Sequence, residues 1–101
     1  MTSSEVTIAS SSDFQIAETA TYREKVESKT FVRFSDRIRD NIYPRLRTNP
    51  YFGANIKRLK GELCSIHRYR MGDYRLFYTI DSSKKLVFIL DIVHRKDAYR
   101  K

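Results

Sequence analysis

Residues 67–80 read HRYRMGDYRLFYTI and give the clearest two-strand pattern in the chain. Side chains on both sides of Gly72-Asp73 alternate between two faces, and this dipeptide is compatible with a tight antiparallel turn. Three arginines and three tyrosines lie in the same stretch. Arginine adds nothing to the backbone pairing of a hairpin, so these side chains indicate a role beyond the fold.

The alternation continues beyond the hairpin and predicts three successive strands, at about 63–70, 74–80 and 86–95. In the last strand, one face is wholly apolar and the other is mixed. The apolar set is Leu86, Phe88, Leu90 and Ile92, and the mixed set is Val87, Ile89, Asp91, Val93 and Arg95. We expect helices to cover the apolar set, together with Leu76, Tyr78 and Ile80 of the strand before it.

Upstream of the meander, the sequence predicts one strand and two helices. Phe14, Ile16 and Ala17 form a short apolar alternation that is typical of a strand. Thr21 with Glu24 resembles a capping box, which predicts a short helix over about 20–28.

The second helix is predicted in TFVRFSDRIRDNIYPRLR, residues 30–47. Its apolar side chains recur at spacings of three and four: Phe31, Phe34, Ile38, Ile42 and Leu46. Pro44 should kink or end this helix, and Thr48-Asn49-Pro50 should stop it. The order of elements indicates an α+β domain in which a helical hairpin lies on one face of a largely antiparallel sheet.

Length and composition indicate one domain. The 101 residues, 41% of them hydrophobic, suit a single core, so we expect residues 13–101 to form one domain after a mobile tail at 1–12. A single cysteine, Cys64, and two histidines give no repeated metal-ligand spacing, and we expect neither a metal nor another cofactor. No membrane-length apolar run or signal-peptide pattern is present, which predicts a cytoplasmic protein.

Net charge is the most informative bulk property. The chain carries +8, and residues 51–101 contribute 12 basic against 5 acidic side chains. A basic surface of this kind favours nucleic acid, an acidic protein or an anionic membrane as a partner, although it can also serve solubility alone.

The strand pattern gathers arginines from three neighbouring strands on one face, namely Arg68, Arg75 and Arg95. A guanidinium stays charged and can bind two phosphate oxygens at once, and Phe77, Tyr51 and Tyr99 are candidates for stacking on bases. The alternative is a structural salt bridge from Asp91 to Arg75 or Arg95. A one-residue slip in register would exchange the two faces of the first strand.

The stretch from Asn49 to Arg100 resembles the RelE/ParE superfamily of type II toxins, most specifically in RYRMGDYRLFY and the terminal HRKDAYR. The resemblance extends over roughly residues 14–100 and implies the RelE-like fold. It also implies cleavage of messenger RNA in the ribosomal A site without a metal, by attack of the ribose 2′-hydroxyl on the adjacent phosphate.

Carried over by position, the resemblance gives Arg75 and Arg95 a role in binding the scissile phosphate and gives Tyr99 a role at the reacting ribose. Arg68 stands where a lysine base is found in RelE itself, but arginine is a poor proton acceptor at neutral pH. His94 is a candidate base, or else a histidine that bonds backbone at the strand end. Further RNA contacts are assigned to Lys57, Lys60, Arg70, Phe77 and Lys96.

Two other functions stay open. A ParE-like toxin would inhibit DNA gyrase by protein contact and would need no nuclease residues, and an inactive module would keep only its contacts with an antitoxin. The resemblance also implies a cognate antitoxin, with an acidic or amphipathic segment over the basic face and the helix at 31–46, in a hetero-oligomeric complex.

Overall fold

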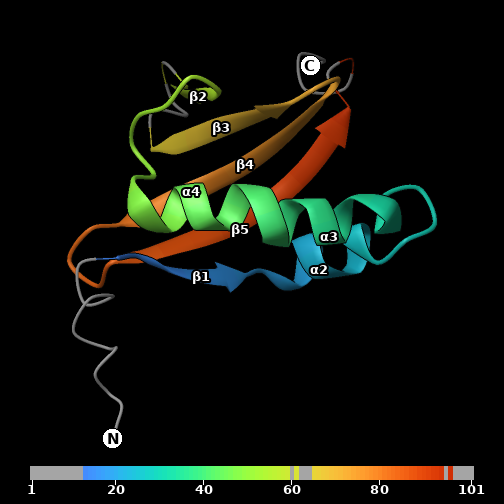
Figure 1. Ribbon diagram of the computed structural model, residues 1–101, viewed down its shortest axis with the longest axis horizontal. Helices are drawn as coiled ribbons and strands as arrows, with labels where there is room; N and C mark the ends of the chain where they lie inside the picture. Colours follow the sequence, from blue (N-terminus) through green and yellow to red (C-terminus); the bar gives the residue numbers. More distant parts are fainter. Residues whose placement is uncertain (1–12, 60, 62–64, 95, 97–101) are drawn as a thin grey trace, which may run out of the picture.

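The computed structural model describes residues 13–59, 61, 65–94 and 96. They form a five-stranded sheet in the order β1-β5-β4-β3-β2, with helices on one face (Figure 1). The strands are β1 (Gln15–Glu18), β2 (Ile56–Arg58), β3 (Ile66–Met71), β4 (Tyr74–Asp81) and β5 (Leu86–His94). β1 runs parallel to β5 and every other pair is antiparallel. The α+β fold and the three-strand meander are confirmed, and β2 is an addition that the alternation did not reveal.

The first helix, α2 (Ala20–Val26), begins at the predicted position and ends two residues before the predicted residue 28, but its N-cap differs. Its N-cap is Thr19, whose hydroxyl accepts the Tyr22 backbone N–H at 3.2 Å, so the capping box at Thr21 was wrong. Tyr22 and Val26 are buried, as their spacing predicts.

The second helix is one run of changing pitch. It passes from a 3₁₀ turn (Val32–Phe34) through α3 (Ser35–Arg37) and a π turn (Ile38–Ile42) into α4 (Tyr43–Thr48). In the π turn the Tyr43 N–H reaches the Ile38 carbonyl, and Pro44 then stands in the first turn of α4, where no intrahelical donor is needed. The helix therefore continues past Pro44 and ends at Thr48, as the stop signal predicts.

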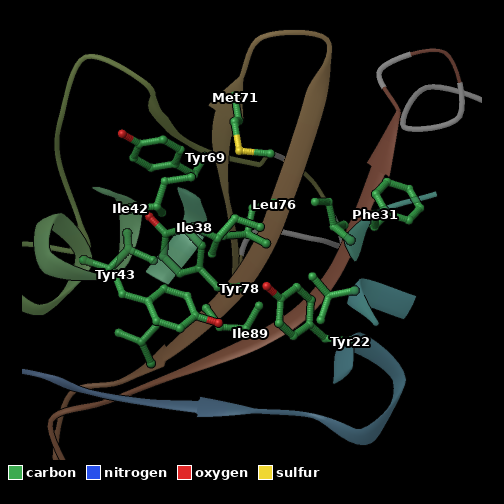
Figure 2. Packing of buried hydrophobic residues seen from close by; sticks show 14 of the residues in the cluster. Tyr22, Phe31, Ile38, Ile42, Tyr43, Tyr69, Met71, Leu76, Tyr78 and Ile89 are labelled. Carbon is green, nitrogen blue, oxygen red and sulfur yellow. The ribbon is translucent and has the colours of Figure 1, made fainter. Parts of the chain in front are cut away.

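The helical stripe and the sheet form one core (Figure 2). Ile38, Ile42 and Leu46 are at most 3% exposed and belong to the same cluster as Leu76 and Tyr78. Each such aliphatic side chain contributes about 1.5–3 kcal/mol when it is fully buried. Tyr78 also donates its hydroxyl proton to the Pro50 carbonyl at 2.7 Å, which fixes the chain where it leaves α4.

A β-bulge in β5 corrects the predicted faces of that strand. Phe77 pairs with Asp91 but Tyr78 pairs with Ile89, so Leu90 is an extra residue and the alternation reverses there. Val87 and Ile89 are therefore fully buried in the core, whereas Phe88 is only partly buried. Of the apolar set predicted to face the helices, Ile92, beyond the bulge, is the fully buried member.

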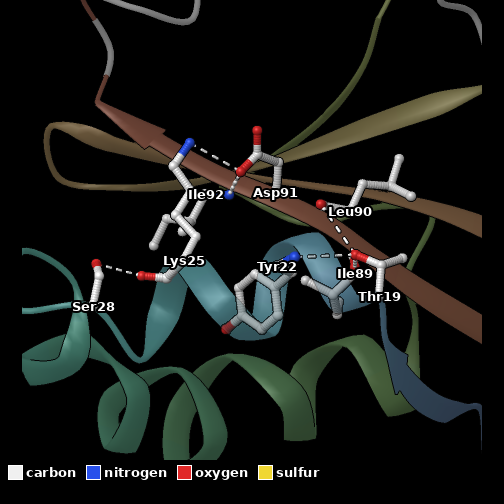
Figure 3. A network of polar contacts seen from close by, with 8 residues as sticks. All are labelled: Thr19, Tyr22, Lys25, Ser28, Ile89, Leu90, Asp91 and Ile92. Atoms are coloured by element: carbon white, nitrogen blue, oxygen red, sulfur yellow. Dashed lines mark hydrogen bonds and ion pairs between the residues drawn. The ribbon is translucent and has the colours of Figure 1, made fainter.

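The bulge lies beyond the end of β1, and side chains replace the missing strand there (Figure 3). The Thr19 hydroxyl is 2.9 Å from the Ile89 carbonyl oxygen and 3.2 Å from that of Leu90. The Asp91 carboxylate accepts the Ile92 N–H at 2.8 Å. Thr19 thus caps α2 and binds the bulge at the same time.

Within the described residues, no helix is long and apolar enough to cross a membrane.

Candidate functional site

The face of the sheet opposite the helices carries a row of side chains from four strands. Lys57, Arg68, Phe77 and Asp91 stand opposite one another in register, and a second row joins Arg70 to Arg75 and Val93. We call this surface the open face; its members are Lys57, Arg68, Arg70, Arg75, Phe77, Asp91 and Val93. His67 and Tyr69 lie on the reverse side, so the predicted register of β3 is confirmed.

Arg75 is held differently from its neighbours. Its side chain is 5% exposed, and Nη1 donates to the carbonyls of Gly72 and Tyr74, each at 3.2 Å. Gly72, at φ 61°, occupies the first position of the two-residue turn, where a glycine tolerates positive φ. The guanidinium is therefore fixed against the turn, and a phosphate that binds it must displace these carbonyls or approach the other nitrogens. Arg70, its partner across the strands, is exposed.

Asp91 does not form the cross-sheet salt bridge considered as an alternative for Arg75. Its carboxylate pairs with Lys25 of α2 at 3.0 Å, a contact between residues too distant in sequence to be predicted from a local pattern. Within the described residues, no carboxylate lies within ion-pair distance of Arg70 or Arg75. These two arginines leave a net positive charge on the open face.

His94 lies on the helix side of the sheet. It stands opposite Tyr74, and the two rings meet edge to face with centroids 5.1 Å apart. Its Nδ1 accepts the Lys96 backbone N–H at 3.2 Å, which selects the tautomer with a proton on Nε2. The histidine thus bonds backbone at the strand end, on the other side from Arg68 and Arg75. Lys96 itself is exposed.

Three predicted site residues, Arg95, Tyr99 and Lys60, lie outside the described residues, as does Cys64. Tyr51, a candidate for base stacking, instead packs on the core side against Phe14 and His67, with ring centroids 5.8 and 6.2 Å away. Phe77 is half-buried on the open face between Arg68 and Asp91.

His67 is buried beneath the sheet and stacks on Tyr78 with ring centroids 5.5 Å apart. Burial, with a smaller contribution from the positive charge of Arg58, lowers the pKa of this imidazole below its ordinary value. A neutral ring on the core side is a packing element, and it does not face the arginines of the open face.

A second basic feature lies around the free edge of β3. We call it the basic groove: a cavity of about 390 Å³ lined by Arg37, Asn41, Arg45, Asn55 and Arg70, with Ile42, Tyr69, Met71 and Gly72. Arg37 and Arg45 were not among the site residues predicted from the sequence. The spacing of Arg37, Asn41 and Arg45 at i, i+4 and i+8 was the available signal.

Among the described residues, no group of three or more His, Cys, Asp or Glu side chains could hold a metal ion. The basic side chains of the open face are guanidinium and ammonium groups, which bind and neutralise anions.

Comparison with known proteins gives a consistent set of relatives. A family model for the ParE toxin of type II toxin-antitoxin systems matches residues 19–99. Toxin RelG of Mycobacterium tuberculosis is 44% identical over 45 residues, which make up 45% of this chain and 52% of RelG. The match thus spans about half the length of that relative.

Solved structures share the fold over most of the chain. The toxin-antitoxin complex RelBE2 of Mycobacterium tuberculosis contains a chain with a TM-score of 0.70 and 28% identity, covering 84% of this chain and 94% of that one. A YoeB/ParE toxin from Agrobacterium tumefaciens gives a TM-score of 0.66 at 19% identity, with 80% and 98% covered. The archaeal RelE-RelB complex of Pyrococcus horikoshii gives 0.59 at 22% identity, with 81% and 94% covered. At these last two identities the likeness concerns the fold alone.

Proposed function

This chain belongs to the ParE toxin family of type II toxin-antitoxin systems, within the RelE/ParE superfamily, and we propose that it is an endoribonuclease that cleaves messenger RNA on its open face. The observation that carries the proposal is the gathering of Arg68, Arg70 and Arg75 on one face of two adjacent strands. Guanidinium groups so placed can bind a phosphate and stabilise the charge that develops on it.

The proposed reaction requires no cofactor. The ribose 2′-hydroxyl gives up its proton as its oxygen forms a bond to the adjacent phosphorus, the bond from phosphorus to the 5′-oxygen breaks, and the 5′-oxygen takes up a proton. The products are a 2′,3′-cyclic phosphate and a 5′-hydroxyl. Arginine holds its proton at neutral pH, so Arg68 neutralises the phosphate and does not act as the base.

The proposal assigns Arg75 and Arg95 to the scissile phosphate, and Lys57, Arg70 and Phe77 to flanking nucleotides. Lys60 and Lys96 are proposed as further contacts with the RNA backbone. Tyr99 is assigned to proton transfer in preference to His94, because the His94 ring packs on Tyr74 on the other side of the sheet. The substrate is proposed to be ribosome-bound.

The test is brief induction in bacteria, followed by mapping of new RNA 5′ ends. Cuts at codon-phased positions are expected with the original chain and should disappear with Tyr99→Phe and Arg68→Gln. Arg47→Gln, which removes an exposed charge from α4, is the matched control and should cut normally. Uncut messenger RNA in growth-arrested cells would contradict the nuclease proposal.

The second candidate function is inhibition of DNA gyrase by protein contact, which the match to the ParE toxin model favours. A supercoiling assay with purified gyrase separates the two functions. Loss of supercoiling with intact messenger RNA would establish this alternative and exclude the first.

A cognate antitoxin is proposed as the natural partner, since relatives of this fold were solved as toxin-antitoxin complexes. Before the toxin is released from its antitoxin, we expect the two proteins to form a soluble hetero-oligomer in the cytoplasm. Purification of the chain with the product of an adjacent reading frame tests this partnership.

A further inference from the structure

The basic groove concentrates the positive charge of three arginines, Arg37, Arg45 and Arg70. Arg37 and Arg45 project from the helical run two turns apart, and Arg70 reaches the groove from β3. In the described part of the chain, no carboxylate forms an ion pair with any of the three. The described residues that line the groove include no acidic side chain, and the Arg45 guanidinium donates a long hydrogen bond, of 3.4 Å, to the Tyr69 hydroxyl.

Three guanidinium groups around one small groove repel one another, so an anion that binds there relieves the repulsion. Arginine offers parallel N–H donors that match phosphate oxygens, and the Asn41 and Asn55 amides add neutral donors to the lining. The groove therefore has the donors of a phosphate site.

Arg70 connects the groove with the open face. In the sheet it stands opposite Arg75, one row from Arg68, and it also lines the groove. Arg70 can reach the groove because β2 ends before it. Within the described residues, β2 pairs with His67, Arg68 and Tyr69, and beyond them the Arg70 N–H donates to the Asn55 carbonyl. Positive charge thus runs from one face of the sheet around the β3 edge to the other.

We propose that the basic groove is a second phosphate-binding site, which takes the backbone of the same RNA strand as that strand passes from the open face around the edge at Arg70. The inference rests on the proposed function, because the open face supplies the RNA. Continuity through Arg70 favours this ligand over an acidic peptide, which would need no connection with the open face.

The experiment compares two charge-matched double variants of the full chain by fluorescence anisotropy. Arg37→Gln with Arg45→Gln removes the groove arginines, and Arg39→Gln with Arg47→Gln removes two exposed arginines of the same helical run outside the groove. The probes are a trinucleotide and an RNA of about 12 nucleotides, both with 2′-O-methyl riboses that prevent cleavage. Circular dichroism verifies that both variants fold.

For the longer RNA, the slope of log affinity against log salt should be less negative in the groove variant than in the original chain. The expected difference is about 1.4, at about 0.7 for each of two lost phosphate contacts. The factor by which the groove variant binds this RNA more weakly than the original chain should therefore be about 25-fold larger at 0.1 M salt than at 1 M salt. The control pair should lose less than about threefold, and trinucleotide binding should not change in either variant.

Equal losses in the two variants, or no loss in the groove variant, would overturn the inference. So would a polyglutamate peptide whose binding depends on the groove arginines while RNA binding does not. The proposed cleavage is judged separately with unmodified RNA: if the original chain binds RNA through the groove but never cuts it, the groove site stands and the nuclease proposal fails.

Discussion

Thr19 is the residue whose replacement tests the account of the β5 bulge most directly. Its hydroxyl accepts the Tyr22 N–H as a helix cap, and its single proton is shared between the Ile89 and Leu90 carbonyls. Thr19→Val keeps the shape of the side chain and removes both functions. The cap is worth about 1 kcal/mol, and the half-buried hydrogen bond to the bulge about another 1 kcal/mol.

We therefore expect Thr19→Val to lower the free energy of unfolding by about 2 kcal/mol, which corresponds to a loss of roughly 8 °C or more in Tm and about 1 M in the urea midpoint. Thr19→Ser keeps the hydroxyl and loses one half-buried methyl group, so it should cost no more than about 0.8 kcal/mol. Urea unfolding followed by circular dichroism measures both variants.

The bulge itself can be followed by amide hydrogen exchange. The Thr19 hydroxyl holds the bulge, in which the Ile92 N–H is bonded by the neighbouring Asp91 side chain. Loss of the hydroxyl should loosen the bulge, so we expect faster amide exchange at residues 89–92 in Thr19→Val and unchanged exchange in β3. A valine variant within about 0.5 kcal/mol of the serine variant would refute the double role of Thr19.

Three further perturbations follow from buried or paired groups. Tyr78→Phe leaves the Pro50 carbonyl without its 2.7 Å hydrogen bond and should cost about 1–2 kcal/mol in urea unfolding. Lys25→Gln breaks a half-exposed ion pair with Asp91 and should cost about 0.5 kcal/mol at low salt; a loss that persists at 1 M salt would contradict an ionic origin. The pKa of His67 is lowered in the folded protein, so the unfolded chain binds the proton first and stability should fall as pH drops below about 6.5. His67→Phe should flatten this part of the pH profile, and an unchanged slope between pH 7.5 and 5 would show that another group is responsible.

The helical elements were largely predictable because their signals are local. The spacing of Phe31, Phe34, Ile38, Ile42 and Leu46 predicted the buried stripe; Phe34 is partly buried against the core and the other four are buried. What local spacing did not give was the N-cap at Thr19, whose choice over Thr21 depends on carbonyls of β5 seventy residues away in sequence. The π turn before Pro44 likewise reconciles a proline with a continuous helix, where sequence rules predicted a kink or an end.

Part of the candidate site was also predictable. Arg68, Arg70 and Arg75 share a face because strict alternation holds in β3 and β4. The partner of Asp91 was not predictable, because Lys25 approaches from a helix that is distant in sequence. The same is true of the groove, where arginines of the helical run meet Arg70 only after the helices dock on the sheet.

The sequence by itself determined the order of the elements other than β2, the charge of the C-terminal half and the arginine side of the hairpin, since each depends on residues within a few positions of one another. Tertiary structure alone decided which side chains of β5 enter the core. A strand held by β4 along its whole length, and by β1 only as far as Ile89, can take up an extra residue at Leu90 where the second partner ends. The resulting reversal buries Val87 and Ile89 and leaves Asp91 on the open face. This outcome depends on two neighbouring strands and one helix cap, so it cannot be predicted from the alternation of a single strand.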